Sequence, residues 1–313
     1  MQVGHEKSIV VLGTGGTIAG AAASAADHVG YKAGQVPVRQ LLAGIPALAQ
    51  VPVVAEQVAQ IDSKDMDPAV WLALAERCQH WIAQADVAGV VITHGTDTLE
   101  ETAYFLHRVL APAKPIVLTC AMRPATALSA DGPQNIADAV TVARTAGARG
   151  VVAVCAGRVH SAVDVRKVHP YRLDAFSSGD AGVLGHVEDG RLRQLRDWPA
   201  HGAAALPLQA LGAKDDWPRV EIVLSHAGGS GRAVQALVRD GVQGLVVAGT
   251  GNGSVHSALE DALLEAARQG IPVLRSTRCA EGQVIARDED PLRPTSLTPV
   301  QARIELQLQL LAR

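Results

Sequence analysis

Several features are missing from this sequence, and each absence narrows the class of protein. No run of ~18 apolar residues occurs, so we expect no membrane-spanning segment. No dense run of Lys and Arg occurs and the formal net charge is −3, which argues against nucleic acid as a partner. The first residues carry no charged segment followed by an apolar one, so no secretory signal is visible. A cytoplasmic protein is therefore favoured, with a mature form that has already lost a signal as the alternative.

Cysteine is scarce as well. The four cysteines are Cys78, Cys120, Cys155 and Cys279, and none of them forms a C-x-x-C pair. Two of them lie in or beside apolar runs of strand-like composition. We therefore expect free, buried or half-buried thiols in a reducing compartment, rather than a disulfide or a zinc site.

The residues that are present suit a folded protein of two α/β domains. Apolar residues make up 48% of the 313-residue chain and charged residues 19%, and the length exceeds that of one ordinary domain. In the first half, strand-like runs at 8–12, 51–58, 89–93, 115–119 and 151–155 alternate with helical patterns at 67–85, 98–110 and 130–146. This alternation predicts a parallel sheet covered by helices.

The pattern changes after residue 159. Residues 182–195 read as a hairpin whose turn is Asp189-Gly190. Residues 198–217 are rich in Pro, Gly and Ala and are the predicted linker. Strands at 220–225, 244–248 and 271–276 then alternate with helices at 231–240, 254–269 and from Thr298 onwards. We therefore predict a larger N-terminal domain over 1–197 and a smaller C-terminal one over 218–313, both α/β with mainly parallel sheets.

Glycine and threonine gather where two predicted strands end. The stretches are 13–17 (GTGGT) and 94–98 (HGTDT), and a third glycine-rich exit lies at 249–254. Ligands of open parallel sheets bind at the carboxyl ends of strands, so these three stretches are candidate ligand-binding segments. Dinucleotide binding fits poorly, because Ile18 stands where G-x-G-x-x-G requires its last glycine.

A threonine hydroxyl attacks only when another group takes its proton. The candidates are a lysine held neutral by burial, anchored by Asp97, or a tyrosine with a lowered pKa. Thr98 is also explained as a helix N-cap. The Ala-rich segment 21–34 suits a helix, but it has no large apolar residue from Gly20 to His28, so a mobile loop or lid is an equally good prediction.

The stretches 14–20 (TGGTIAG) and 94–103 (HGTDTLEETA) resemble the two signature motifs of the bacterial-type L-asparaginases. The resemblance continues through 121–124 (AMRP), 129–133 (SADGP) and 251–253 (GNG), and so covers nearly the whole chain. It implies hydrolysis of L-asparagine to L-aspartate and ammonia through an acyl-enzyme, without metal or cofactor. An L-glutaminase or mixed glutaminase-asparaginase is the alternative substrate assignment, and a non-enzymatic amino-acid-binding protein is the alternative class.

The resemblance also implies roles for individual residues. Thr17 would be the nucleophile and Tyr31 the lid tyrosine, and Thr96, Asp97 and Lys167 would form a second proton relay. Ser63 would grip the substrate α-carboxylate and Asp97 its α-ammonium. The remaining substrate-binding residues would be Gly16, Lys64, Thr96 and Ala121, joined by Asn252 and Glu289 from a neighbouring subunit.

Shared sites of this kind imply an intimate homodimer, usually assembled as a dimer of dimers. One position departs from the family pattern, because Lys64 stands where many members have Gln or Glu. A second cation there would repel a substrate ammonium unless it pairs with Asp65 or Glu289.

Overall fold

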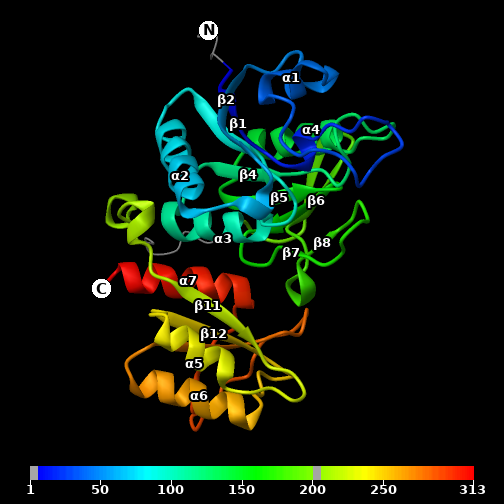
Figure 1. The fold of residues 1–313 in the computed structure, drawn as a ribbon. Coiled ribbons are helices and arrows are strands. Elements are labelled where there is room, and N and C mark those ends of the chain that lie inside the picture. The colour runs from blue at the N-terminus through cyan, green and yellow to red at the C-terminus, as the bar shows by residue number, and fades with distance from the viewer. Residues whose placement is uncertain (1–5, 200–205) are drawn as a thin grey trace. The chain divides into compact units, whose positions relative to one another are not determined.

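The chain divides into two compact units, Met1–Leu208 and Gln209–Arg313, in a computed structural model that describes residues 6–199 and 206–313. Each unit contains a mainly parallel sheet flanked by helices, which confirms the predicted fold class (Figure 1). The division falls within the segment 198–217. Trp198, the first residue of that segment, is buried in the core of the N-terminal unit, so this core extends into the predicted linker.

The N-terminal unit is built on an eight-stranded sheet with the order β10-β9-β6-β5-β4-β3-β1-β2. Five neighbouring strands run parallel: β2 (Val53–Ile61), β1 (Ser8–Gly15), β3 (Val87–Thr93), β4 (Pro115–Thr119) and β5 (Gly150–Cys155). The antiparallel strands are β6 (Arg158–Ser161), β9 (Gly185–Glu188) and β10 (Arg191–Gln194). A separate two-stranded ladder pairs β7 (Arg166–Lys167) with β8 (Phe176–Ser177).

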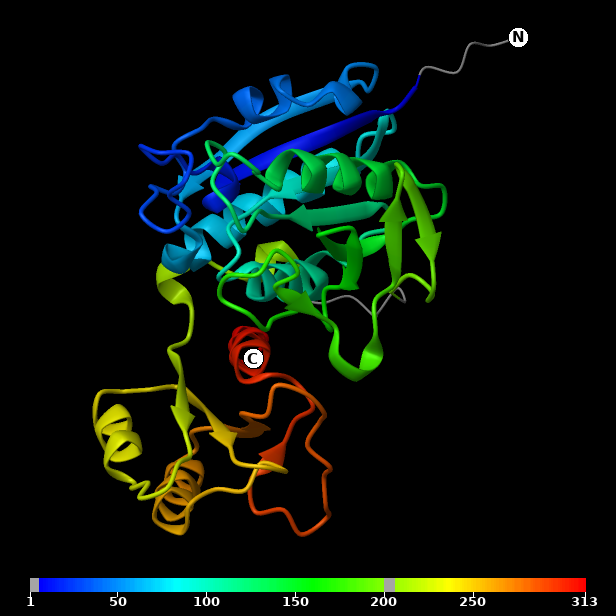
Figure 2. The same cartoon turned by 90° about the vertical axis from the view of Figure 1, so that its right-hand side faces the viewer.

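Helices cover both faces of this sheet (Figures 1 and 2). On one face α1 (Val38–Ala43) and α4 (Gly132–Arg144) pack on Ile9, Val11 and Val117. Because side chains alternate across a strand, Val10 and Ile92 point to the other face, which α2 (Pro68–Ile82) and α3 (Leu99–Leu110) cover. Strands buried on both faces account for the continuous apolar runs of the sequence.

Local signals explain where the long helices begin. The Asp67 carboxylate accepts the backbone N–H of Val70, and Pro68 occupies the first helical position of α2. The hairpin β9–β10 turns at Asp189 and Gly190, whose φ angles of 48° and 67° suit a two-residue turn, as predicted. The sequence analysis did not predict α1 or β6, and β2 begins two residues later than expected.

The C-terminal unit repeats the α/β pattern on a smaller scale. Its parallel strands are β11 (Val220–Leu224), β12 (Gly244–Gly249), β13 (Val273–Thr277) and β14 (Arg293–Pro294), in that order. Leu245 and Val247 face a core formed with α5 (Arg232–Arg239) and α6 (Ser257–Arg268), whereas Val246 faces α7 (Pro299–Leu311). A capping box between Thr298 and Gln301 begins α7.

All four cysteines are free thiols, and only Cys279 is exposed. The sulfurs of Cys120 and Cys155 lie 3.2 Å apart at the ends of β4 and β5. Among the helices of the described residues, none is long and apolar enough to cross a membrane.

Candidate active site

The two glycine-threonine stretches lie side by side at one edge of the sheet. They follow β1 and β3, which pair in parallel register from Ile9 opposite Gly89 to Gly13 opposite Thr93. The strand order β2-β1-β3-β4-β5 places the reversal of connectivity at β1. In open parallel sheets such a switch point leaves a crevice at the carboxyl ends of the strands, and ligands bind there.

Glycines allow the two stretches to touch through their backbones. Gly16 has a φ of 76°, a conformation that L side chains rarely adopt. A Cβ atom at Gly16 would lie 2.2 Å from the Cα of Gly95. A Cβ atom at Gly95 would in turn lie 2.4 Å from the hydroxyl oxygen of Ser63. The glycines therefore bring Thr17, Ser63 and Thr96 into one small space.

The segment after Thr17 folds back over it. Residues 21–34 form a loop rather than a helix, and this loop is closed at its base by two backbone hydrogen bonds of 3.0 Å between Ala21 and Lys32. The hydroxyl of Tyr31 then lies 2.6 Å from Oγ1 of Thr17, which is itself buried. A Cβ atom at Gly20 would lie 2.7 Å from the Tyr31 ring, so glycine is needed for this approach.

The environment of Tyr31 disfavours one of the expected activation routes. Burial raises the pKa of Tyr31 above its ordinary value of 10.0, and the hydrogen bond from Thr17 offsets this only in part. The carboxylates of Asp62 and Asp97 raise it further. The prediction of a tyrosine with a lowered pKa was therefore wrong, because two negative charges and a low-dielectric site disfavour the phenolate. The influence of Asp97 also shows that the two polar clusters are electrostatically close.

The second cluster joins β7 to the loop after β3. The Lys167 ammonium donates to Oγ1 of Thr96 at 2.8 Å and to Oδ1 of Asp97 at 2.5 Å. Thr96 in turn donates to Asp97 at 3.4 Å. The side chain of Lys167 is 16% exposed and that of Asp97 is 54% exposed, so the carboxylate remains open to a ligand.

The loop that follows β2 is tied to the same place. Ser63 is buried, and its hydroxyl accepts the backbone N–H of Asp97 at 3.3 Å. Thr98 precedes α3 but makes no side-chain capping bond there; its hydroxyl donates instead to the carbonyl of Ser63 at 2.7 Å. Thr98 therefore occupies the predicted N-cap position of α3, but its hydroxyl connects two loops instead of capping the helix. Lys64 turns away to an exposed ion pair with Asp65 at 2.5 Å.

The segment that follows β4 also lies at this edge of the sheet. Ala121 is buried directly after this strand, and Asp131 accepts the backbone N–H groups of Met122 and Arg123 at 2.9 and 3.0 Å. Asn252 and Glu289, by contrast, belong to the C-terminal unit, where both are exposed.

The sequence analysis assigned no role to two groups beside the site, the buried His94 and the half-buried Glu100. His94 Nδ1 donates to the Gly95 carbonyl at 2.7 Å, because a carbonyl can only accept. Nε2 of the neutral ring therefore accepts the Thr102 hydroxyl at 2.9 Å, and Thr102 in turn accepts Trp71 Nε1–H at 2.9 Å. Burial lowers the pKa of His94 to about 4, which keeps the imidazole neutral. The chain of donors thus fixes the peptide that precedes Thr96.

Glu100 is the other missed residue. Its carboxylate accepts the backbone N–H of Lys167. No local pattern relates Glu100 to a residue 67 positions away.

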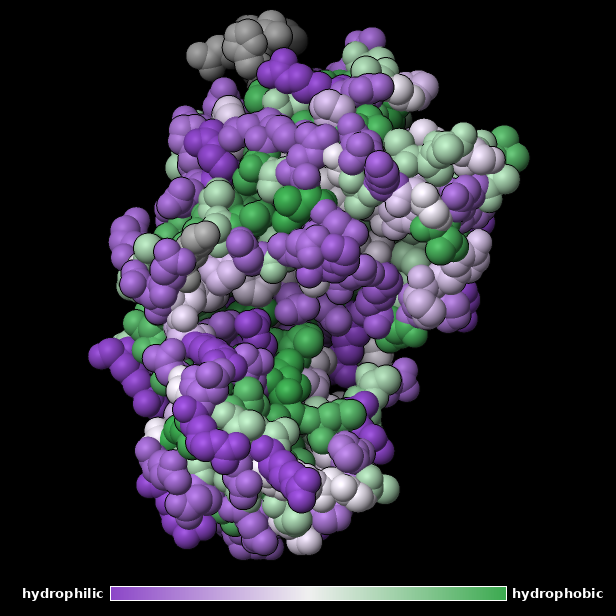
Figure 3. Space-filling model, in the orientation of Figure 1, coloured by the Kyte–Doolittle hydropathy of each residue, from purple (hydrophilic) through white to green (hydrophobic). Residues whose placement is uncertain are grey.

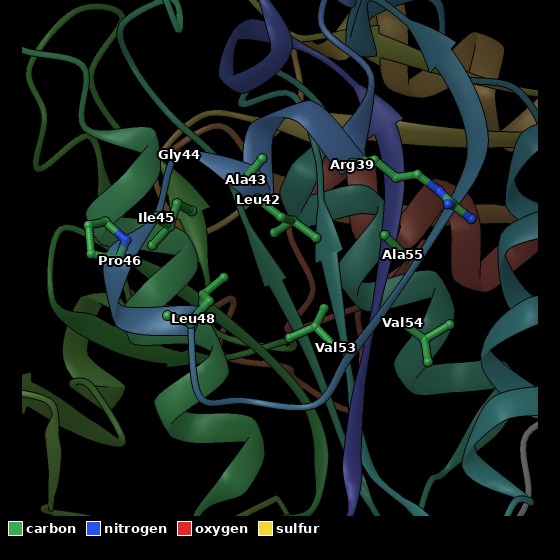
Figure 4. A pocket seen from close by; sticks show the side chains of 11 residues that line it. Arg39, Leu42, Ala43, Gly44, Ile45, Pro46, Leu48, Val53, Val54 and Ala55 are labelled. Atoms are coloured by element: carbon green, nitrogen blue, oxygen red, sulfur yellow. The ribbon is translucent and has the colours of Figure 1, made fainter.

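Hollows elsewhere on the surface do not contain the predicted residues. A hollow of about 690 Å³ lies beside α1 and β2, where Leu42, Ile45, Leu48 and Val53 surround it and Arg39 is at its margin (Figure 4). Another of about 830 Å³ lies along β11 and α5. We therefore place the candidate active site at the carboxyl ends of β1 and β3, where the polar side chains gather, and not in these hollows. Within residues 6–199 and 206–313, no three His, Cys, Asp or Glu side chains gather in a way that would hold a metal ion.

Comparison with known proteins places this geometry in a family. Residues 8–199 match the family model described as asparaginase, N-terminal, and residues 219–313 match the glutaminase/asparaginase C-terminal domain. The L-asparaginase 2 of Bacillus subtilis (strain 168) is 38% identical over 310 residues, which is 97% of this chain and 82% of that protein. The glutaminase-asparaginase of Pseudomonas fluorescens biotype A is 41% identical over 286 residues, 90% of this chain and 78% of that protein.

A solved structure agrees with these sequence matches. The crystal structure of a probable cytoplasmic L-asparaginase from Campylobacter jejuni is 40% identical, covers 97% of this chain and 95% of its own, and superposes with a TM-score of 0.92. The chain therefore belongs to the asparaginase family, with both of the family's domains present.

Proposed function

We propose that this protein is an L-asparaginase, an amidohydrolase that converts L-asparagine and water to L-aspartate and ammonia. The observation that carries the proposal is the 2.6 Å contact between Thr17 Oγ1 and Tyr31, beside the Lys167–Thr96–Asp97 cluster. A binding protein needs neither a buried hydroxyl held by a second hydroxyl nor a lysine bound to both a threonine and a carboxylate. Two relatives with names of this activity, at 38% and 40% identity, support the same assignment.

The proposed first half-reaction uses Thr17. Its oxygen bonds to the side-chain amide carbon of the substrate, the C–N bond breaks, and the nitrogen leaves as ammonia. The hydroxyl proton of Thr17 must end on that nitrogen. A protonated Tyr31 suits this transfer, because it accepts from Thr17 while giving its own proton onwards, so the unfavourable phenolate is never required.

The second half-reaction frees Thr17. A water molecule attacks the acyl carbon, the bond to Thr17 breaks, and Thr17 regains a proton. Thr96, Asp97 and Lys167 supply a donor, an acceptor and a positive charge within hydrogen-bond reach of one another. The proposed substrate contacts are the α-carboxylate with Ser63 and the α-ammonium with the open carboxylate of Asp97, while Gly16, Thr96 and Ala121 line the space beside Thr17.

The direct test is Thr17→Ala. We expect loss of ammonia release from L-asparagine with little change in melting temperature, because the change removes only the hydroxyl and the methyl group of one side chain. The matched control is Thr145→Ala after the far end of α4, where the Thr145 hydroxyl donates to the Thr141 carbonyl. Full activity in Thr17→Ala would refute the assignment of the nucleophile.

L-Glutamine is the second candidate substrate, because the Pseudomonas fluorescens relative at 41% identity is named a glutaminase-asparaginase. Ammonia release from both amino acids at low concentration measures the preference. Comparable specificity constants would make the enzyme a mixed glutaminase-asparaginase.

We propose a homotetramer, a dimer of dimers, in which the C-terminal unit gives Asn252 and Glu289 to a neighbour's site. The proposed division is a catalytic domain over 1–197, a linker over 198–217 and the donating domain over 218–313. Exposed apolar side chains support burial of this unit against another subunit: Ile222 and Leu224 lie on the edge strand β11, and hydrophobic residues gather on the C-terminal unit in Figure 3. Mixing inactive Thr17→Ala subunits with weakly active Glu289→Ala subunits should raise activity above that of either variant alone, because some sites in the mixture would then be complete.

We also propose a cytoplasmic location. It is supported by the three buried free thiols and by the name of the Campylobacter jejuni relative. Cell fractionation with detection of the chain tests it.

A further inference from the structure

Arg275 is a buried arginine on β13 of the C-terminal unit, 7% exposed. Its Nη1 donates to the carbonyl of Asn252 at 2.9 Å and approaches that of Gly253 at 3.4 Å. Its Nη2 pairs with Asp290. One guanidinium therefore joins a strand to two separate loops.

The same two loops also bind each other. The Asn252 side chain donates to the Ile285 carbonyl at 3.0 Å and accepts the Ile285 N–H at 2.7 Å. Asp290 also accepts the backbone N–H of Arg287 at 2.9 Å. The loop at 249–254 and the loop at 278–290 therefore form one hydrogen-bonded body around Arg275.

The backbone is shaped to admit this side chain. Gly253 has a φ of 81°, and a Cβ atom there would lie 2.8 Å from Nη1 of Arg275. Lysine would not serve as well, because an ammonium is a point charge, whereas the planar fork of arginine donates in two directions at once. The Nε atom is buried without a hydrogen bond in the part of the chain that the structure describes. The guanidinium therefore binds both loops through its Nη atoms while its Nε–H group has no hydrogen-bond acceptor among the described residues.

Stability alone does not account for this arrangement. A buried ion pair is often no more stabilising than apolar residues of the same size, because both charges lose their hydration. The pair does fix positions. The Asn252 carbonyl accepts from Nη1 of Arg275, and Glu289 directly precedes Asp290, which binds Nη2. Glu289 itself is exposed, so its place depends on that neighbouring anchor.

We propose that Arg275 is a positioning residue that sets the joint geometry of Asn252 and Glu289. It does not touch the substrate. This rests on the proposed function in one respect, namely that these two residues complete a neighbouring subunit's site.

The first test is Arg275→Lys, which keeps the charge and the pairing with Asp290 but loses the hold on the two carbonyls. We expect the KM for L-asparagine to rise about tenfold, which corresponds to about 1.4 kcal/mol of binding free energy, while kcat changes less than about threefold. The matched control is Arg303→Lys in α7, where Arg303 donates to the Val220 carbonyl at 3.0 Å. Unchanged kinetics in Arg275→Lys would overturn the proposal.

A double-mutant cycle locates the effect. If Arg275 acts through Asn252 and Glu289, adding Arg275→Lys to the Asn252→Ala/Glu289→Ala variant should change kcat/KM by less than about twofold. The full tenfold loss in that background would place its action elsewhere and overturn the proposal. Arg275→Met with Asp290→Asn provides a second variant without a lone buried charge, and it should show the same KM effect.

Amide hydrogen exchange gives a readout that does not depend on activity. In Arg275→Lys we expect faster exchange at 249–254 and 281–290 together, with β11 and β12 unchanged. Unchanged exchange in both loops would overturn the proposal even if the wild-type protein released no ammonia from asparagine or glutamine. The latter result would instead refute the proposed function.

Discussion

Replacing Glu100 with Gln should change how the stability of the protein depends on pH. Glu100 is half-buried in the first turn of α3. The pKa of Glu100 is raised from the ordinary 4.5 to about 7, chiefly by burial and then by the negative charge of the neighbouring Glu101. The backbone N–H of Lys167 and the charges of Arg166 and Lys167 lower it, but they offset only part of the rise.

The sign of the effect follows from the two pKa values. Between pH 4.5 and about 7 the unfolded chain ionises this carboxyl while the folded chain keeps it protonated, so stability is lost as the pH rises through that window. One pKa unit corresponds to about 1.4 kcal/mol, so the full difference amounts to about 3 kcal/mol at most. Gln cannot ionise. Glu100→Gln should therefore match the wild type at pH 4.5 and exceed its free energy of unfolding by up to about 3 kcal/mol at pH 8.

Urea unfolding at these two pH values, at one protein concentration, measures this difference. Trp71 and Trp81 of α2 report on the N-terminal unit by fluorescence. The matched control is Glu76→Gln, because Glu76 is exposed on α2. If Glu100→Gln gains no more stability between pH 4.5 and pH 8 than this control does, the assigned environment of Glu100 is wrong.

Three further substitutions test the site itself. Tyr31→Phe removes the hydroxyl 2.6 Å from Thr17, so kcat should fall by about 10²-fold or more with little change in melting temperature; steady-state ammonia release within threefold of the wild type would contradict this. Gly16→Ala places a Cβ atom 2.2 Å from Gly95, so activity and melting temperature should both fall, whereas Gly44→Ala, with nothing within 4 Å, should be silent in both assays. Asp65→Asn frees the Lys64 ammonium and should raise the KM for L-asparagine severalfold by charge repulsion, whereas Lys64→Gln should leave it within about twofold; equal effects of the two would show that the ion pair is irrelevant to binding.

Local sequence signals placed most of the fold. The strands at the centre of each sheet appeared as uninterrupted apolar runs because both of their faces are buried. Asp67-Pro68 and Thr298-Pro299 marked helix starts because capping depends on residues only a few positions apart. The helix α1 escaped because it is six residues long and is stabilised by packing rather than by its own propensity.

The sequence also named the participants in the site, because the stretches around Thr17 and Thr96 resemble family motifs. Only the tertiary structure decided their chemistry. The pKa of Tyr31 depends on burial and on two carboxylates distant in sequence. The hydroxyl of Thr98 donates to the carbonyl of Ser63, which belongs to another loop. Glu100 meets Lys167 only because β7 passes beside the start of α3. Backbone propensity and capping are local in the chain and can be read from it, whereas desolvation and charge–charge interactions depend on distances that exist only after folding.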